Sequence, residues 1–279
     1  MNGYFLVPEQ LKQFQERLYH EEKSAVTIEK YLRDVIKFSQ FASEKEISKE
    51  VVVQYKKYLQ EKNYAVRSIN SMLTSVNRFF DFLGWTDCKV KTLRSQRQIY
   101  CPEDKELSKA EYLRLLEASR PYPQLNHIIQ TICSTGIRIS ELKYFTVEAI
   151  HNSEVSITCK NKTRIILIPG KLRKLLLDFA KKNQIKSGII FRTKSGKPVD
   201  RSNIWAKLKR LCKSANVSPS KVFPHNLRKL FARTFYKIEK DIAKLADILG
   251  HTSVETTRIY IMTTGQEHRQ KIERLGLVV

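Results

Sequence analysis

Apolar residues recur at helical intervals through the first 95 residues, where no stretch alternates as a β-strand would. Ser24 is placed to open one of the predicted helices, and Gly84 is placed to end another as a C-cap. The aromatic residues within these stripes are predicted core residues. The pattern therefore predicts a helical domain over residues 1–95, with apolar helix faces at residues 11–18, 28–38, 51–59 and 69–83.

A change of pattern follows this domain. Residues 96–107 lack a sustained period and contain Pro102, so they are predicted to be an interdomain linker. Ser108 and Glu111 then have the spacing of a capping box, which opens a helix at the start of a second domain over residues 108–279.

The second domain is predicted to be mostly helical. A helix over residues 124–134 is expected to end at Gly136. Alternating apolar residues predict two short strands, at residues 155–159 and 165–168, joined by a polar turn at 160–163. Helices are expected again from Gly170 onward. The predicted class is mainly α with a small antiparallel β-sheet.

The formal net charge of +23 is concentrated in one part of the chain. Residues 160–237 carry 22 Lys and Arg side chains against only two acidic ones, Asp178 and Asp200. Repulsion within such a span costs stability unless an anion binds there. Nucleic acid is the predicted partner, because each neutralised phosphate releases counterions and adds affinity. An anionic membrane surface is the weaker alternative.

Other classes of protein fit the sequence poorly. The longest aliphatic run, residues 165–168, is far shorter than the ~20 residues of a membrane-spanning helix, and residues 1–9 show no signal peptide. The five cysteines include no CxxC pair, so they predict neither a disulfide framework nor a zinc site. The basic span offers no carboxylate cluster for a metal pair. We therefore expect a cytoplasmic protein without a metal or cofactor.

Four residues near the C-terminus suit chemistry on a phosphodiester. Arg228 offers a planar fork of donors for a phosphate, and His225 lies three positions earlier, on the same face of a predicted helix. Each of the two histidines, His225 and His251, can take up or release a proton near neutral pH. The hydroxyl of Tyr260 can attack phosphorus and form a covalent intermediate. Alone, His225 is equally a helix cap and Tyr260 a packed aromatic residue, so the rest of the chain decides.

Five motifs follow one another along the chain: the segment TGIRISEL at 135–142 with Arg138, Lys160 between two predicted strands, His225 and Arg228, Leu249-Gly250-His251, and Tyr260 nine residues later. In this order and over most of the chain, the set resembles the tyrosine recombinase (phage integrase) family. The resemblance implies a SAM-like, core-binding helical domain at 1–95, a linker at 96–107 and a catalytic domain at 108–279.

The resemblance also implies a metal-free reaction through a 3′-phosphotyrosine link. Arg138 and Arg228 would hold the non-bridging oxygens of the phosphate and stabilise the charge of the transition state. Tyr260 would be the nucleophile. Since the covalent link retains the energy of the broken bond, rejoining would need no ATP.

The remaining roles follow from the same resemblance. His225 would accept a proton or a hydrogen bond, and His251 would add a hydrogen bond to the phosphate. Lys160 would protonate the departing 5′ oxygen. Relatives often have Gly-Lys-Gly at this turn, whereas here Lys162 follows closely, so either lysine can be the acid; the position relative to Arg164 and the second strand favours Lys160. Glu141 would support the site from behind Arg138.

The expected partner is double-stranded DNA carrying inverted-repeat core sites, with no membrane and no small-molecule substrate. The expected assembly is a homo-tetramer in synapsis, with a monomer as the candidate free form. Integration, inversion and resolution all remain open. A type IB topoisomerase-like nicking–closing enzyme and an inactive DNA-binding regulator are the alternatives. The apolar end of the tail, residues 275–279, is expected to dock on a neighbouring protomer, with folding back onto its own domain as the alternative.

Overall fold

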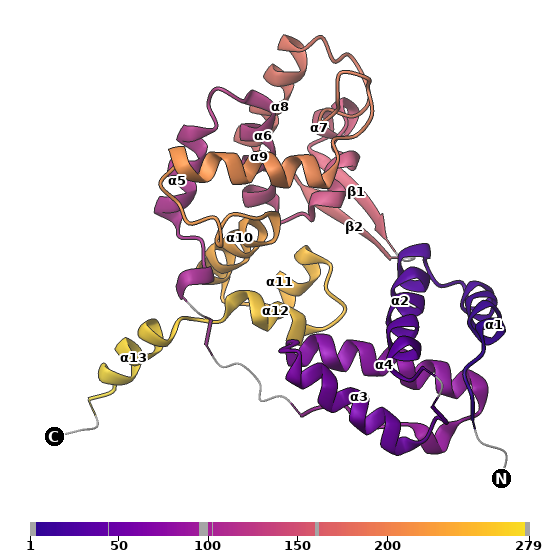
Figure 1. The fold of residues 1–279 in the computed structure, drawn as a ribbon. Helices are drawn as coiled ribbons and strands as arrows, with labels where there is room; N and C mark the ends of the chain where they lie inside the picture. Colours follow the sequence, from indigo (N-terminus) through magenta and orange to yellow (C-terminus); the bar gives the residue numbers. More distant parts are fainter. Residues whose placement is uncertain (1–3, 44, 95–99, 102, 160–161, 277–279) are drawn as a thin grey trace. The chain divides into compact units, whose positions relative to one another are not determined.

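The computed structural model describes residues 4–43, 45–94, 100–101, 103–159 and 162–276. The chain forms two compact units, Met1–Arg97 and Gln98–Val279. In Figure 1 the first unit has the indigo to purple colours and the second the magenta to yellow colours. The division falls within the segment predicted as the linker. Cys101 and residues 103–107 of that segment belong to the second unit.

The first unit is helical, and its core is rich in aromatic residues. Ser24 caps the second helix by accepting from Thr27 N, and Gly84 ends the fourth in the left-handed conformation, as predicted. Phe38 contacts Tyr55 and Phe80 edge to face, a favourable geometry for buried rings. The elements are α1 (Pro8–His20), α2 (Ala25–Phe41), α3 (Lys49–Glu61), α4 (Val66–Leu83) and the short 3₁₀ turn η1 (Thr86–Cys88).

The second unit is also mainly helical. The predicted capping box is present, because Ser108 accepts from Glu111 N while the Glu111 carboxylate accepts from Ser108 N. Its elements are η2 (Glu103–Lys105), α5 (Lys109–Ala118), α6 (Pro123–Thr135), η3 (Ile139–Tyr144), α7 (Val147–His151), β1 (Glu154–Cys159), β2 (Lys162–Leu167), α8 (Gly170–Lys182), α9 (Arg201–Ser214), α10 (Pro224–Glu239), α11 (Ile242–Leu249), α12 (Val254–Ile261) and α13 (Gly265–Glu273).

Strands β1 and β2 form an antiparallel two-stranded sheet, so the predicted fold class is confirmed. The predicted turn at 160–163 was too long, because β2 begins at Lys162, which pairs with Cys159. Side chains alternate along β2 and the residue that follows it. Ile166 and Ile168 are buried, whereas Ile165 and Leu167 are exposed.

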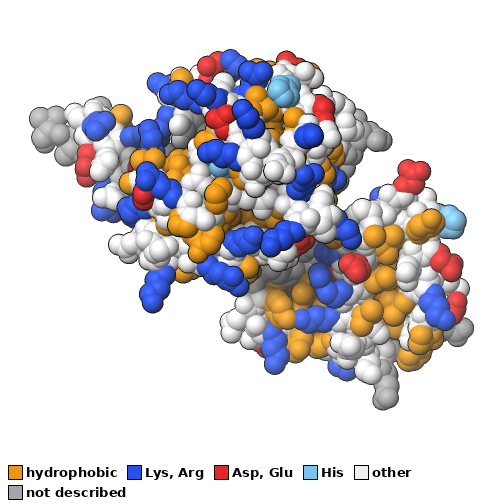
Figure 2. Space-filling view, turned by 90° about the horizontal axis from the view of Figure 1, so that it is seen from above, with side chains coloured by type: hydrophobic (Ala, Val, Ile, Leu, Met, Phe, Trp, Pro, Cys, Tyr) orange, Lys and Arg blue, Asp and Glu red, His pale blue; other side chains and the backbone are white. Residues whose placement is uncertain are grey.

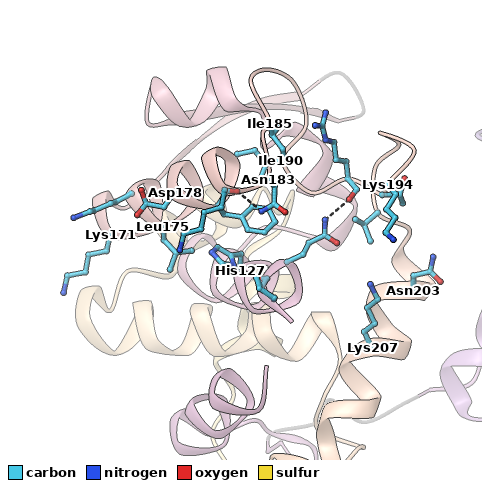
Figure 3. A pocket seen from close by; sticks show the side chains of 18 residues that line it. His127, Lys171, Leu175, Asp178, Asn183, Ile185, Ile190, Lys194, Asn203 and Lys207 are labelled. Atoms are coloured by element: carbon cyan, nitrogen blue, oxygen red, sulfur yellow. Dashed lines mark hydrogen bonds between the residues drawn. The ribbon is translucent and has the colours of Figure 1, made fainter. Parts of the chain in front are cut away.

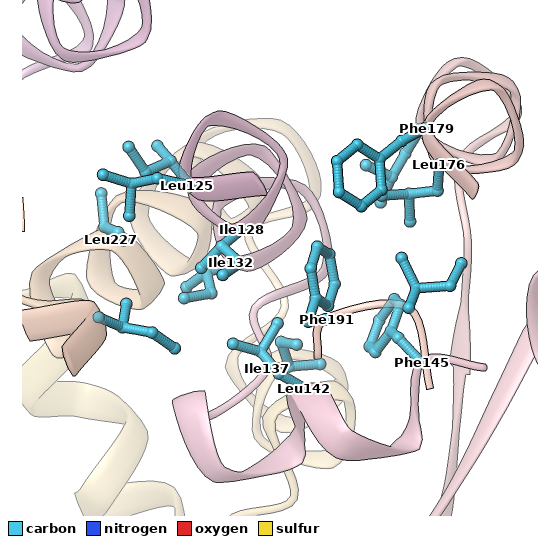
Figure 4. Packing of buried hydrophobic residues seen from close by; sticks show 14 of the residues in the cluster. Leu125, Ile128, Ile132, Ile137, Leu142, Phe145, Leu176, Phe179, Phe191 and Leu227 are labelled. Carbon is cyan, nitrogen blue, oxygen red and sulfur yellow. The ribbon is translucent and has the colours of Figure 1, made fainter. Parts of the chain in front are cut away.

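The core of the second unit lies between α6, η3, α8 and α10. Figure 4 shows Ile128 and Ile132 of α6 near Leu227 of α10, with Phe191 beside them and Phe145 beyond Phe191. This core holds α6 and α10 against each other, and both helices lead to the candidate site. Among the described residues, no helix is long and apolar enough to cross a membrane.

Candidate active site

Three chain segments far apart in sequence meet at the N-terminal half of α10. That helix begins at Pro224, whose missing N–H costs nothing at this position, and presents His225 and Arg228 one turn apart. Gly136 ends α6 in the left-handed conformation, which turns the chain into Arg138. Gly250 ends α11 in the same way and turns the chain toward α12.

Arg228 is the centre of the arrangement and is 1% exposed. Its Nη1 donates to Gly136 O at 2.6 Å, and its Nη2 donates to Leu249 O at 2.6 Å. The carbonyl ends of α6 and α11 are thus joined through one guanidinium, which satisfies carbonyls that a helix leaves open. Burial, and then the charge of Arg138, lowers the pKa of Arg228 to about 10, so the group remains charged at neutral pH.

Arg138 lies beside Arg228 and is oriented by Glu141. The Glu141 carboxylate accepts from Arg138 Nη1 at 3.1 Å and from the Arg138 backbone N at 2.6 Å. Arg138 Nη2 donates to Gly250 O at 3.3 Å, one residue from the carbonyl that Arg228 binds. Since 41% of the Arg138 side chain is exposed while Glu141 is buried, the arginine keeps a surface open to a ligand.

Glu141 also binds a second arginine. Arg164 of β2 donates at 2.8 Å to Glu141 Oε2, the oxygen that also accepts from the Arg138 backbone N. The Arg164 side chain passes so close to Gly250 that a Cβ there would lie 2.0 Å from Arg164 Nη1. Gly250 also has a φ of 63°, where side chains are strained. Glycine is therefore required at this position by both space and conformation.

His251 lies between Arg228 and Thr257. Its Nε2 is 3.0 Å from Arg228 Nη2, and its Nδ1 is 2.8 Å from Thr257 Oγ1. Burial, followed by the charges of Arg228, Arg138 and Arg164, lowers the pKa of His251 to about 4. The imidazole is therefore neutral at physiological pH.

Tyr260 of α12 is 6% exposed and lies against both histidines. Its hydroxyl is 3.4 Å from His225 Nδ1. The ring centroid is 4.9 Å from that of His225 and 4.9 Å from that of His251, and Arg228 Cζ lies 5.8 Å from it. Although His225 keeps an exposed edge, partial burial and the charges of Lys229, Arg228 and Arg138 lower its pKa.

Five of the six predicted catalytic residues are brought together, namely Arg138, His225, Arg228, His251 and Tyr260. The sixth, Lys160, lies outside the described residues. Lys162 is placed by its backbone pairing with Cys159 alone. Lys162 is the first residue of β2, the strand that also carries Arg164.

Two residues that support the site, Arg164 and Thr257, were not predicted from the sequence. Arg164 was detectable from strand alternation, because it shares one face of the strand with the buried Ile166 and Ile168. A charged residue at an inward position needs a partner. Thr257 gave no comparable signal. Thr252 and Glu255 have the spacing of a capping box in the sequence, but the residue that caps α12 is Ser253, which accepts from Glu255 N.

A separate cavity of about 1360 Å³ lies at the opposite end of α6 from Gly136. Figure 3 shows Lys194, Asn203 and Lys207 near one another on one side of its lining, and His127 of α6 on another side, near Leu175. None of the described catalytic candidates lines it.

On the face seen in Figure 2, Lys and Arg side chains outnumber Asp and Glu. Among the described residues, no group of three His, Cys, Asp or Glu side chains is placed to hold a metal.

Comparisons with known proteins find relatives that match most of the chain. The chain is 28% identical to the tyrosine recombinase XerA of Pyrococcus furiosus, over 97% of this chain and 95% of that protein. It is 27% identical to the tyrosine recombinase XerD of Halalkalibacterium halodurans, over 85% of this chain and 87% of that protein.

Two solved structures have a similar fold. The crystal structure of XerA recombinase is 26% identical, with a TM-score of 0.55 over 97% of this chain and 99% of that one. A lambda integrase (75–356) dimer bound to a COC′ core site is 16% identical, with a TM-score of 0.76 over 94% of this chain and 97% of that one. The phage integrase family model matches residues 105–267, and that of the N-terminal SAM-like domain matches residues 11–87. The chain therefore belongs to the phage integrase family.

Proposed function

We propose that the protein is a tyrosine-type site-specific recombinase, which cleaves and rejoins DNA through a 3′-phosphotyrosine intermediate. The observation that carries this proposal is the placement of Tyr260 beside His225 and over the buried guanidinium of Arg228. A packed tyrosine of the core needs neither partner. The relatives are recombinases, which disfavours a nicking–closing enzyme or an inactive regulator.

The two arginines would bind the attacked phosphate. Three of the five N–H groups of Arg228 are used by Gly136 O, Leu249 O and His251, which leaves one on Nη1 and one on Nε. The Nε group is buried and has no hydrogen-bond partner among the described residues. Because its carbonyl contacts hold the guanidinium in place, Arg228 needs no reorganisation when charge develops on the phosphate.

Tyr260 would attack phosphorus, and the bond from phosphorus to the 5′ oxygen would break. His225 Nδ1, which is 3.4 Å from the hydroxyl, would accept the phenolic proton, since depression of its pKa leaves the imidazole neutral and able to accept. His251, already a neutral acceptor toward Arg228, would order that arginine. Either Lys160 or Lys162 would donate a proton to the departing 5′ oxygen.

The assembly would form on DNA. Similar folds are described as a lambda integrase dimer bound to a COC′ core site and as a tetramer bound to a Holliday junction. We expect this protein to form a tetramer that holds two duplexes whose core sites are inverted repeats. Away from DNA, we expect it to be a monomer. The protein would act in the cytoplasm on nucleoid DNA.

A nicked suicide substrate tests the proposal. Inverted repeats beside the encoding gene supply the candidate site, and the nick lets a short fragment diffuse away so that the covalent complex accumulates. We expect the wild-type chain to form a covalent adduct and Tyr260→Phe to form none while still binding the DNA. Tyr236→Phe, a half-buried tyrosine of the same cluster, is the matched control and should react normally. An adduct formed by Tyr260→Phe would contradict the assignment.

A further inference from the structure

The chain entering the second unit is bound to the segment that follows Tyr260. We call Cys101 together with residues 103–107 the strap. Cys101 N donates to Thr263 O at 3.0 Å, and Cys101 forms a parallel bridge with Thr264. Cys101 and Thr264 are both 9% exposed. The strap therefore reaches within four residues of the predicted nucleophile.

The strap also contacts the start of α10. Asn226, which is 2% exposed, donates from Nδ2 to Lys105 O at 2.6 Å and to Lys221 O at 2.8 Å. Asn226 is the neighbour of His225 in the chain. Ser220 Oγ donates to Asp104 O at 3.2 Å. The strap is thus bound by side-chain and backbone hydrogen bonds both to the segment after Tyr260 and to the start of α10.

An ion triad completes the connection. Arg233 of α10 pairs through Nη1 with Glu106 of the strap, and through Nη2 with Glu267 of α13 at 3.1 Å. The side chains of Arg233 and Glu106 are 17% and 10% exposed, whereas that of Glu267 is 38% exposed. Breaking a buried pair leaves an uncompensated charge, so the Glu106 contact is costly to lose.

The position of Tyr260 depends on what holds the chain after it. Tyr260 is the penultimate residue of α12, and α13, all of whose residues are described, buries none of them. The downstream chain is anchored through Thr263, Thr264 and Glu267, and through the ring contact of His268 with Tyr100. Arg233 lies five residues after Arg228 on the same helix, so an anchor on Arg233 is an anchor on the phosphate-binding helix.

We propose that Glu106 and Arg233 are positioning residues, which hold the nucleophile segment in register with His225 and Arg228. The inference rests on the proposed function. Neither side chain is among the proposed phosphate ligands; each acts through the placement of Tyr260. Misplacement of a reacting group by about 1 Å costs on the order of 10²-fold in rate, so loss of one arm of the triad has a measurable effect.

The test compares Glu106→Gln with Glu148→Gln. Glu148 lies on α7, away from the site, and accepts from Gly188 N at 2.9 Å, so this control removes the same charge from another carboxylate that joins two segments. Single-turnover cleavage of the suicide substrate is measured at saturating DNA, together with DNA affinity and thermal unfolding. We expect Glu106→Gln to cleave about 10-fold more slowly with unchanged DNA affinity, and Glu148→Gln to cleave at the wild-type rate.

A second variant guards against misfolding. Glu267→Gln breaks the more exposed arm and should also slow cleavage without weakening DNA binding. Equal cleavage rates for both triad variants and Glu148→Gln would overturn the inference, as would a loss of DNA affinity that accounts for the slower reaction. If wild-type protein forms no adduct at all, the proposed function fails, which is a different result from a wild-type rate in the variants.

Discussion

Arg228 Nη2 lies 3.0 Å from His251 Nε2, and this contact decides the protonation of the histidine. A guanidinium only donates, so Nε2 must accept and carries no proton. The single imidazole proton then resides on Nδ1, which faces Thr257 Oγ1 at 2.8 Å. The arginine therefore selects one neutral tautomer, and the histidine in turn fixes the arginine.

This relationship predicts that the free energy of unfolding depends on pH. The pKa of His251 lies at about 4 in the folded protein and near 6.5 when the chain unfolds, so only the unfolded chain takes up this proton between those values. The stability that neutral His251 contributes is fully present above its pKa in the unfolded chain. It is lost as the pH falls toward its pKa in the folded protein. His225 contributes with the same sign, because its pKa is also lowered.

Urea unfolding at about pH 5 and about pH 7.5 measures the effect. The decrease in the free energy of unfolding should be smaller in His251→Gln than in the wild-type protein, because glutamine does not titrate. An equal decrease in the two proteins would show that His251 is not held neutral by its neighbours.

Gly250→Ala is expected to damage the site from a position that touches no ligand. The new Cβ would displace Arg164, which shares Glu141 with Arg138. Gly196→Ala is the matched control, because Gly196 has a φ of 80° but nothing within 4 Å of its Cβ position. Both variants should lose about 1 kcal/mol to backbone strain.

Only Gly250→Ala should also slow cleavage, by roughly 10-fold or more, through movement of Arg138. Single-turnover rates and urea unfolding of both variants decide the matter. Similar rates would mean that the packing of Arg164 on Gly250 has no catalytic consequence.

Arg228→Lys is expected to reduce cleavage by about 10²–10³-fold, because one ammonium cannot reproduce the fork that binds two carbonyls and a phosphate. Each buried carbonyl left unpaired would cost about 1–3 kcal/mol. Arg173→Lys is the control, since Arg173 also bridges two carbonyls, of Ile150 and His151, at a distance from the site. That variant should lose stability while keeping its cleavage rate; equal losses of rate would contradict the role of Arg228.

Deletion of residues 270–279 should impair recombination more than DNA binding. Ile272 and Leu275 are 52% and 62% exposed, so the tail presents apolar side chains that its own unit does not cover. We expect them to dock on a neighbouring protomer in the synaptic complex. Gel-shift affinity and recombination of a two-site plasmid measure the two properties, and normal recombination by the truncated chain would count against docking.

Local chemistry explains which parts of the fold were predictable. A left-handed C-cap at Gly84 or Gly136 and a side-chain cap at Ser24 or Ser108 depend on a few adjacent residues. The start of β2 was misjudged because Lys162 and Thr163 are polar, although backbone pairing continues through them. Pairing depends on the partner strand, which periodicity in one strand does not report.

The site itself could be predicted only through its motifs. Arg138 and Tyr260 are more than 100 residues apart, and no local signal shows that their elements meet. The order of motifs supplied that information. The role of Arg164 remained hidden, because its importance lies in the carboxylate it shares with Arg138 and in its packing on Gly250.

The central claim is that Tyr260 becomes linked to DNA, and peptide mapping of the covalent complex tests it most directly. Trypsin cuts after Arg258 and Arg269, so residues 259–269 form one peptide in which Tyr260 is the only tyrosine. After nuclease digestion, mass spectrometry should find a nucleotide attached through its 3′ phosphate to this peptide. Attachment to any other peptide, or a complex without a phosphotyrosine bond, would contradict the account.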